Sequence, residues 1–150
     1  MPDKSKVIKA DQYNWKGVEK KIYKTDTQNF KDIHRISLLG DDIPDLNFQT
    51  RYFEIQPCGY SSLEQHRHPH SVIIIRGSGS LVLGNEVFDL DMHDVVYISP
   101  ETIHQFHADK NEPLGFICIV DRYRDRPSIP TDETIKQEIT SQKVLEKIQK

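Results

Sequence analysis

Histidines are the residues with the clearest chemical potential in this chain, because three of them lie close together as His66-Arg67-His68-Pro69-His70. Neutral imidazole is a good ligand for divalent iron, nickel, copper and zinc. If the segment is a strand, His66 and His68 point to the same face and can converge on one ion. We expect Pro69 to end that strand and to place His70 in a tight turn. The spacing therefore favours a metal site, and a polar strand end with solvated histidines is the alternative.

A carboxylate precedes the histidines at a position of the same parity. Glu64 would share the face of His66 and His68 and point into the interior of the fold. A buried carboxylate is costly unless it is paired, so Glu64 could bind the metal, orient a histidine or act as a catalytic base. An ordinary exposed strand glutamate is the alternative.

The elements that must position these residues are short strands separated by turn signals. One face of an expected strand over residues 48–55 carries Phe48, Thr50, Tyr52 and Glu54. The dipeptide Gly84-Asn85 is typical of a hairpin turn between two further strands. The expected strands cover residues 48–55, 72–75, 81–83, 86–90, 95–98, 104–108 and 115–120. Short strands at this spacing predict an all-β sandwich or barrel.

The length of 150 residues predicts a single domain. Within it, the sequence divides into three zones. Residues 1–45 form an N-terminal arm with short strands at Lys21–Tyr23 and Ile33–Leu39, and residues 46–125 form the barrel. Residues 131–149 predict one α-helix, with Thr131 as its N-cap. Its apolar stripe consists of Ile135, Ile139, Val144 and Ile148. The alternating charges of Asp121–Arg126 indicate a salt-bridged edge or a dimer contact.

Composition excludes several classes of protein. Twenty Lys and Arg against 23 Asp and Glu give a net charge of −3, which offers no electrostatic case for nucleic acid or an anionic membrane. The longest apolar run, Phe116–Val120, is far shorter than a membrane span. The polar start predicts no secretory signal. We expect Cys58 and Cys118 to be reduced thiols, and the protein to be cytoplasmic.

Part of the chain resembles the small single-domain cupins. The resemblance lies in Gly59–Gly79, then in Asp94–Pro100 and His104-Gln105-Phe106, and it covers about residues 46–125. His66 and His68 match the His-x-His pair of that family. Counting back from the matching glycine, Gly77, gives His70 at the position where cupins usually have glutamate.

The resemblance implies an all-β double-stranded β-helix, the cupin or jelly-roll barrel, with the N-terminal arm and the C-terminal α-helix attached. It also implies a metal held in the barrel mouth by His66, His68, His70 and His104, and a homodimer. Parity would allow Tyr52 and Phe106 to line the pocket, but core packing is the role that we favour for both. His107 should face the other way, at the surface, and His34 and His93 should be structural or solvated.

Three functions are compatible with such a site. The first is a metal-dependent enzyme for a small molecule, a dioxygenase or an isomerase, with Glu64 or a bound water as base. The cofactor would be a divalent transition metal: iron, manganese, nickel, copper or zinc. The second is a non-enzymatic module that binds a small ligand or the metal as a sensor. The third is a barrel stabilised by a closed, four-coordinate zinc.

Overall fold

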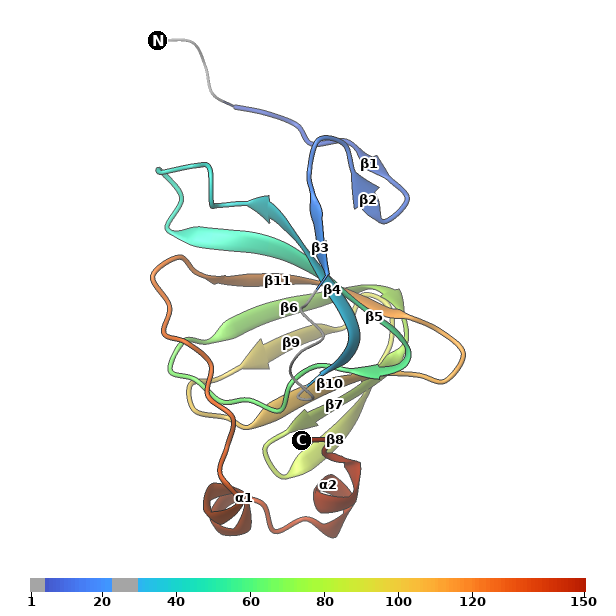
Figure 1. Ribbon diagram of the computed structural model, residues 1–150, viewed down its shortest axis with the longest axis vertical. Helices are drawn as coiled ribbons and strands as arrows, with labels where there is room; N and C mark the ends of the chain where they lie inside the picture. The colour runs from blue at the N-terminus through green and yellow to red at the C-terminus, as the bar shows by residue number, and fades with distance from the viewer. Residues whose placement is uncertain (1–4, 23–29) are drawn as a thin grey trace.

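A curled antiparallel β-sheet forms most of the fold (Figure 1). The computed structural model describes residues 5–22 and 30–150, so residues 1–4 and 23–29 of the expected arm, Tyr23 among them, lie outside the described residues. The sheet contains β3 (Lys20–Ile22), β4 (Lys31–Leu39), β5 (Phe48–Tyr60), β6 (His70–Gly77), β7 (Gly79–Leu83), β8 (Glu86–Leu90), β9 (Val95–Ile98), β10 (His104–Ala108) and β11 (Leu114–Asp121). The main strand order is β8-β7-β10-β5-β11-β6-β9, with β4 pairing to both β5 and β3.

The turn chemistry seen in the sequence sets the strand register. Gly84 has a φ of 59°, a left-handed conformation that glycine adopts without strain. It begins the two-residue turn that pairs Leu83 with Glu86 and joins β7 to β8. The predicted all-β barrel with a helical C-terminus is confirmed.

The long strand β5 separates the interior of the half-barrel from a second buried face. Phe53 and Ile55 belong to the main hydrophobic core. Tyr52 points the opposite way and packs against Trp15 of β2 (Asn14–Trp15), with ring centroids 5.0 Å apart. β2 forms a small hairpin with β1 (Ala10–Asp11). Tyr52 is therefore a buried packing residue, the role favoured from the sequence, and it does not line the pocket, because the arm buries the outer face of β5.

A polar network fills the rest of that outer face. The Tyr52 hydroxyl donates to Glu54 at 2.9 Å, and Arg76 forms an ion pair with the same carboxylate. His34 Nε2 lies 3.5 Å from Glu54 Oε2. Burial opposes ionisation of Glu54, but hydrogen bonds from Tyr52, Gln56 and Arg76 hold its pKa below the usual value. His34 thus has the structural role that the sequence predicted.

The C-terminal zone contains two short helices where one helix over 131–149 was expected. They are α1 (Asp132–Glu138) and α2 (Gln142–Lys147). Ser141 caps α2 by accepting from the Val144 amide, and Asn85 satisfies the backbone at the break: its side chain accepts from Thr140 N and Ser141 N and donates to the Glu138 carbonyl. Because local capping competes with helix propagation, the helix is interrupted here. Thr131 is the N-cap of α1, as predicted.

The two helices pack against the barrel at the β8 end, away from the β1–β2 hairpin (Figure 1). Their apolar stripe joins a second core cluster, which consists of Leu63, Val82, Ile103, Ile135, Ile139 and Val144. The fully buried Gln105 side chain of β10 donates to the Gln149 carbonyl and accepts from the Gln149 amide, both at close to 2.9 Å. The C-terminal segment therefore covers the outer face of β10.

His107 is buried, although the sequence predicted it at the surface. Its parity was correct, since it faces away from His104, but the face it occupies lies under the C-terminal segment. Only 7% of the residue is exposed, and its Nε2 atom has no hydrogen-bond partner among the described residues. Burial, helped by the charge of Lys147, lowers the pKa of His107 to about 4.

Two further observations concern the environment of the chain. Among the described residues, no helix has the length and apolarity needed to cross a membrane. Cys58 is exposed and Cys118 is buried, and both are free thiols.

The buried imidazole predicts an acid-sensitive fold. The unfolded chain takes up a proton on His107 near pH 6.5, whereas the folded chain does so only near pH 4. Stability should therefore be lost as pH falls through this window, by about 3 kcal/mol at most. Urea unfolding measures this. Between pH 7 and pH 4, the free energy of unfolding should fall less for His107→Leu than for the natural sequence. Parallel pH profiles for the two proteins would contradict this prediction.

Candidate metal centre

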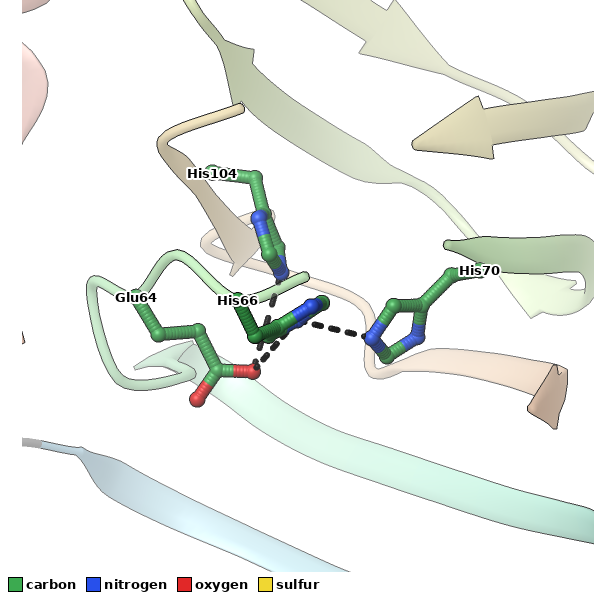
Figure 2. Close-up of side chains that lie close together, drawn as sticks. All are labelled: Glu64, His66, His70 and His104. Atoms are coloured by element: carbon green, nitrogen blue, oxygen red, sulfur yellow. Dashed lines mark hydrogen bonds and ion pairs between the residues drawn. The ribbon is translucent and has the colours of Figure 1, made fainter. Parts of the chain in front are cut away.

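Four side chains converge in one mostly buried place (Figure 2): Glu64, His66, His70 and His104. One donor atom from each lies within 4.8 Å of all the others. Metal bonds to nitrogen and oxygen are about 2.0–2.2 Å long for zinc, so ligands on opposite sides of an ion lie about 4.4 Å apart. The spacing of the four donors fits a single divalent ion.

Backbone pairing positions two of the four residues. Glu64 and His104 form an isolated antiparallel bridge, in which each amide donates to the other residue's carbonyl at 3.1 and 3.0 Å. Their side chains meet, with Glu64 Oε1 3.6 Å from His104 Nε2. The bridge brings together residues forty positions apart in the sequence.

The other two ligand candidates come from a loop and from the strand that follows it. His66 lies in irregular structure, not in a strand, and His70 is the first residue of β6. The order expected from the sequence is thus reversed: Pro69 precedes a strand and does not end one. His70 pairs with Ile98 of β9, which fixes its backbone.

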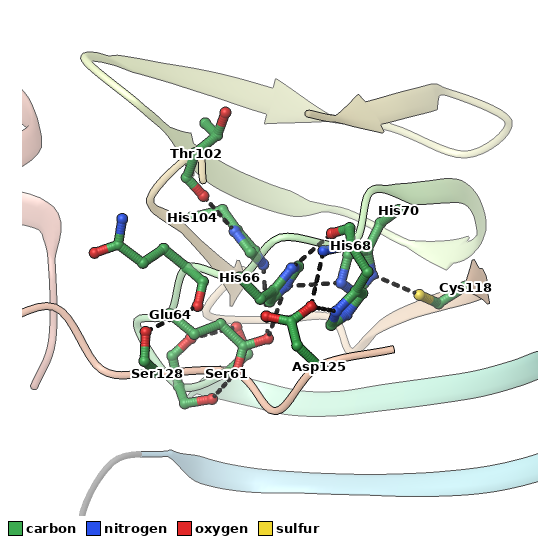
Figure 3. Close-up of polar contacts among 12 residues, drawn as sticks. Ser61, Glu64, His66, His68, His70, Thr102, His104, Cys118, Asp125 and Ser128 are labelled. Carbon is green, nitrogen blue, oxygen red and sulfur yellow. Dashed lines mark hydrogen bonds and ion pairs between the residues drawn. The ribbon is translucent and has the colours of Figure 1, made fainter. Parts of the chain in front are cut away.

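Hydrogen bonds at the outer ring nitrogens orient two imidazoles (Figure 3). His66 Nδ1 lies 2.7 Å from the His68 carbonyl, and His104 Nδ1 lies 2.8 Å from the Thr102 carbonyl. A carbonyl oxygen can only accept, so each Nδ1 carries the proton and each Nε2 presents a lone pair to the centre. Metal-binding histidines are typically held in this way by partners behind the ring.

The centre concentrates electron-rich atoms. His66 Nε2 lies 2.9 Å from His70 Nε2 and 3.7 Å from Glu64 Oε1. Burial and the imidazoles of His104 and His66 beside it lower the pKa of His70 to about 2, so this ring is neutral at physiological pH. Burial opposes ionisation of Glu64, but the contacts of its carboxylate with His104 and His66 and the hydrogen bond from Ser62 hold its pKa far below the usual value. A divalent cation would match this donor set.

His68 lies beside this group but outside it. Its Nδ1 atom is 2.9 Å from Asp125 Oδ1, and its ring stacks on His66 with centroids 3.7 Å apart. Asp125 also accepts from the backbone amides of Arg67 and His68, which holds the loop in place (Figure 3). Of the residues predicted to form the site, the structure brings together Glu64, His66, His70 and His104, and it gives His68 a different partner.

Sequence reasoning missed Asp125 as part of the site. It lies in the alternating charges of Asp121–Arg126, which indicated an edge or a contact surface. No spacing rule links Asp125 to a histidine 57 positions away. The chain crosses the barrel in between, and only the fold shows that the two side chains meet.

A cavity of about 300 Å³ opens beside the centre. Glu64, His70 and His104 line it together with Phe106, which also belongs to the main hydrophobic core. The Cys118 thiol also faces it, with Sγ 2.9 Å from His70 Nδ1. Protein sites for small molecules usually have volumes of about 300 Å³ or more, so this cavity can admit a small substrate.

Comparison with known proteins assigns the family. The Cupin domain family matches residues 51–120. A Rhodospirillum rubrum protein named 1-methylthio-D-xylulose 5-phosphate methylsulfurylase is 38% identical over 122 residues, which are 81% of this chain and 77% of that protein.

This chain is a cupin. A cupin-2 conserved barrel protein from Rhodopseudomonas palustris is 39% identical and superposes with a TM-score of 0.85, covering 91% of this chain and 93% of that chain. A cupin-2 domain from Rhodospirillum rubrum is 36% identical with a TM-score of 0.79, covering 87% of each chain. The resemblance of the histidine motifs to the small cupins is thereby confirmed.

The cupin centre predicts different outcomes for neighbouring histidines. We expect His70→Ala to lose bound metal, because it removes one of the four converging donors. We expect His68→Ala to keep it, because His68 lies outside the group of four donors that are within 4.8 Å of one another. Elemental analysis of proteins purified without a polyhistidine tag would measure both, with circular dichroism to verify folding. Loss of metal in both variants would instead support a site made of the four histidines.

Proposed function

We propose that this cupin is a metal-dependent enzyme that acts on a small phosphorylated sugar. Glu64, His66, His70 and His104 would hold the metal. The observation that carries this proposal is the opening of the four-donor centre onto a cavity, since three of the four residues also line that cavity. A closed structural zinc site would not need such a space.

The Rhodospirillum rubrum relative supports the substrate class. Its name specifies a five-carbon sugar phosphate that carries a methylthio group, and the similarity extends over 77% of that protein. Cupin barrels host unrelated chemistries. The proposed substrate class therefore rests on this relative and on the donor set of the site, not on the fold. We propose 1-methylthio-D-xylulose 5-phosphate, or a close analogue, as the substrate.

The residues at the centre would have separate roles. A bound divalent metal would act as a Lewis acid towards an oxygen of the sugar. His66 and His104 are oriented by the carbonyls behind them and would present fixed nitrogens. Glu64, which also accepts from the Ser62 hydroxyl at 2.9 Å, would complete the site as a ligand or as the base for a substrate proton. The donor set suits iron, manganese, nickel, copper or zinc.

The proposal predicts metal-dependent turnover. We expect the metal-loaded protein to convert 1-methylthio-D-xylulose 5-phosphate in buffer containing a small thiol, which keeps Cys58 and Cys118 reduced. Chelation or His104→Ala should reduce turnover roughly a hundredfold or more, because each disrupts the electrophilic centre. Phosphorus NMR of substrate and product measures the rate, and Arg126→Gln, an exposed change, is the control.

The same experiment separates the enzyme from a non-enzymatic module. Binding of the sugar phosphate that raises the melting temperature without any conversion would favour a ligand sensor. Turnover that survives complete loss of metal in His104→Ala would contradict the metal-dependent mechanism. Conversion that returns when one metal is restored would identify the cofactor.

Assembly and location are proposals of the same kind. We propose a cytoplasmic homodimer. The two free cysteines favour a reducing compartment. Val95 and Tyr97 are 72% and 66% exposed on the edge strand β9, where apolar side chains favour contact with a second copy.

A further inference from the structure

Three arginines line the same cavity as the candidate metal centre. Arg35 comes from β4, Arg51 from β5 and Arg124 from the segment that follows β11. The only carboxylate that lines the cavity in the described structure is Glu64, which already contacts His66 and His104. The cavity thus has an excess of positive charge over negative charge before any metal is added.

Arg51 is the most buried of the three, with 7% of the residue exposed. Its Nη2 atom lies 3.5 Å from Cys118 Sγ, and its guanidinium lies 5.0 Å from the centre of the Phe53 ring. Its Nε atom has no hydrogen-bond partner within the described part of the chain. A buried guanidinium lowers stability unless an anion pairs with its charge and acceptors satisfy its N–H groups. Stability of the fold therefore does not explain the presence of Arg51 at this position.

The other two arginines also lack a carboxylate partner within the described ranges. Arg124 Nη1 donates to the neutral Gln49 side chain at 2.8 Å and to the Asp121 carbonyl at 3.2 Å. Burial and the charges of Arg51 and Arg35 lower the pKa of Arg124 and outweigh the opposite effect of Cys118 and Asp41, which means that the guanidinium groups repel one another. An anion between them would relieve this repulsion.

We infer that Arg35, Arg51 and Arg124 bind the phosphate group of the substrate, while the metal centre binds its reacting end. This inference rests on the proposed function. Guanidinium groups present paired N–H donors that match phosphate oxygens. A phosphate dianion also compensates more of the positive charge than a carboxylate does.

The geometry allows one small molecule to reach both ends. The Cys118 sulfur contacts Arg51 Nη2 at 3.5 Å and His70 Nδ1 at 2.9 Å, so one side chain separates Arg51 from His70 of the candidate metal centre. A sugar phosphate within the cavity of about 300 Å³ can therefore meet a guanidinium and the metal together. The arginines would fix which end of the substrate faces the metal.

Binding of inorganic phosphate to chelator-treated protein tests the inference without depending on catalysis. Isothermal titration calorimetry should show binding to the natural sequence and much weaker binding of acetate. Arg51→Met and Arg124→Gln should each weaken phosphate binding roughly tenfold or more, because each removes charged donors. Arg126→Gln, an exposed change in the same segment as Arg124, should leave the affinity unchanged.

The melting temperature distinguishes binding from a structural role. Since Arg51 has a buried charge without a carboxylate partner, unliganded Arg51→Met should melt no lower than the natural sequence. If this variant does not fold, the more exposed Arg124→Gln decides. Phosphate affinity that is equal in all variants, or absent from the natural sequence, would overturn the inference, as would equally tight acetate binding. Metal content and turnover, measured separately, would show whether the proposed function fails with it.

Discussion

Placing three imidazoles and a carboxylate within 4.8 Å of one another is the constraint on which the site depends. Lone pairs and a negative charge repel in a buried place, so the fold must hold them there by other means. The Glu64–His104 bridge does this with two backbone hydrogen bonds, and carbonyls behind His66 and His104 fix the direction of their rings. A bound cation would complete the arrangement by joining atoms that otherwise repel one another.

The surrounding structure keeps this centre rigid from both sides. On one side, Asp125 binds the His68 ring and the backbone amides of Arg67 and His68. These hydrogen bonds hold the loop that contains His66 in position. On the other side, the N-terminal arm buries Tyr52 on the outer face of β5, while the inner face of the same strand presents Arg51 to the cavity. The same strand alternation therefore separates a structural network from the functional cavity.

The sequence predicted the strands and most of the site because those features depend on local patterns. Glu64, His66 and His70 came from spacing and parity within seven positions, and His104 came from a family motif. The same local reasoning placed His68 in the metal set, since it assumed a strand over 66–68. The structure has a loop there, so strand alternation does not decide which way the His68 ring faces.

Features that depend on distant contacts could not be predicted in this way. His107 has the parity of an outward residue, but it is buried on the face of β10 that the C-terminal segment covers. The break between α1 and α2 depends on Asn85, which lies more than fifty residues before it. To predict the burial of His107 and the helix break, one must know which surface the C-terminal segment covers.

The three arginines are the clearest case of a feature that local sequence patterns cannot predict. Arg35, Arg51 and Arg124 lie far apart in the sequence, and no spacing rule connects them. They meet because β4 and β11 both pair with β5 and because their side chains share the inner face. Burying like charges together lowers stability unless a ligand compensates for them. Their placement is therefore explained better by what the cavity binds than by how the barrel folds.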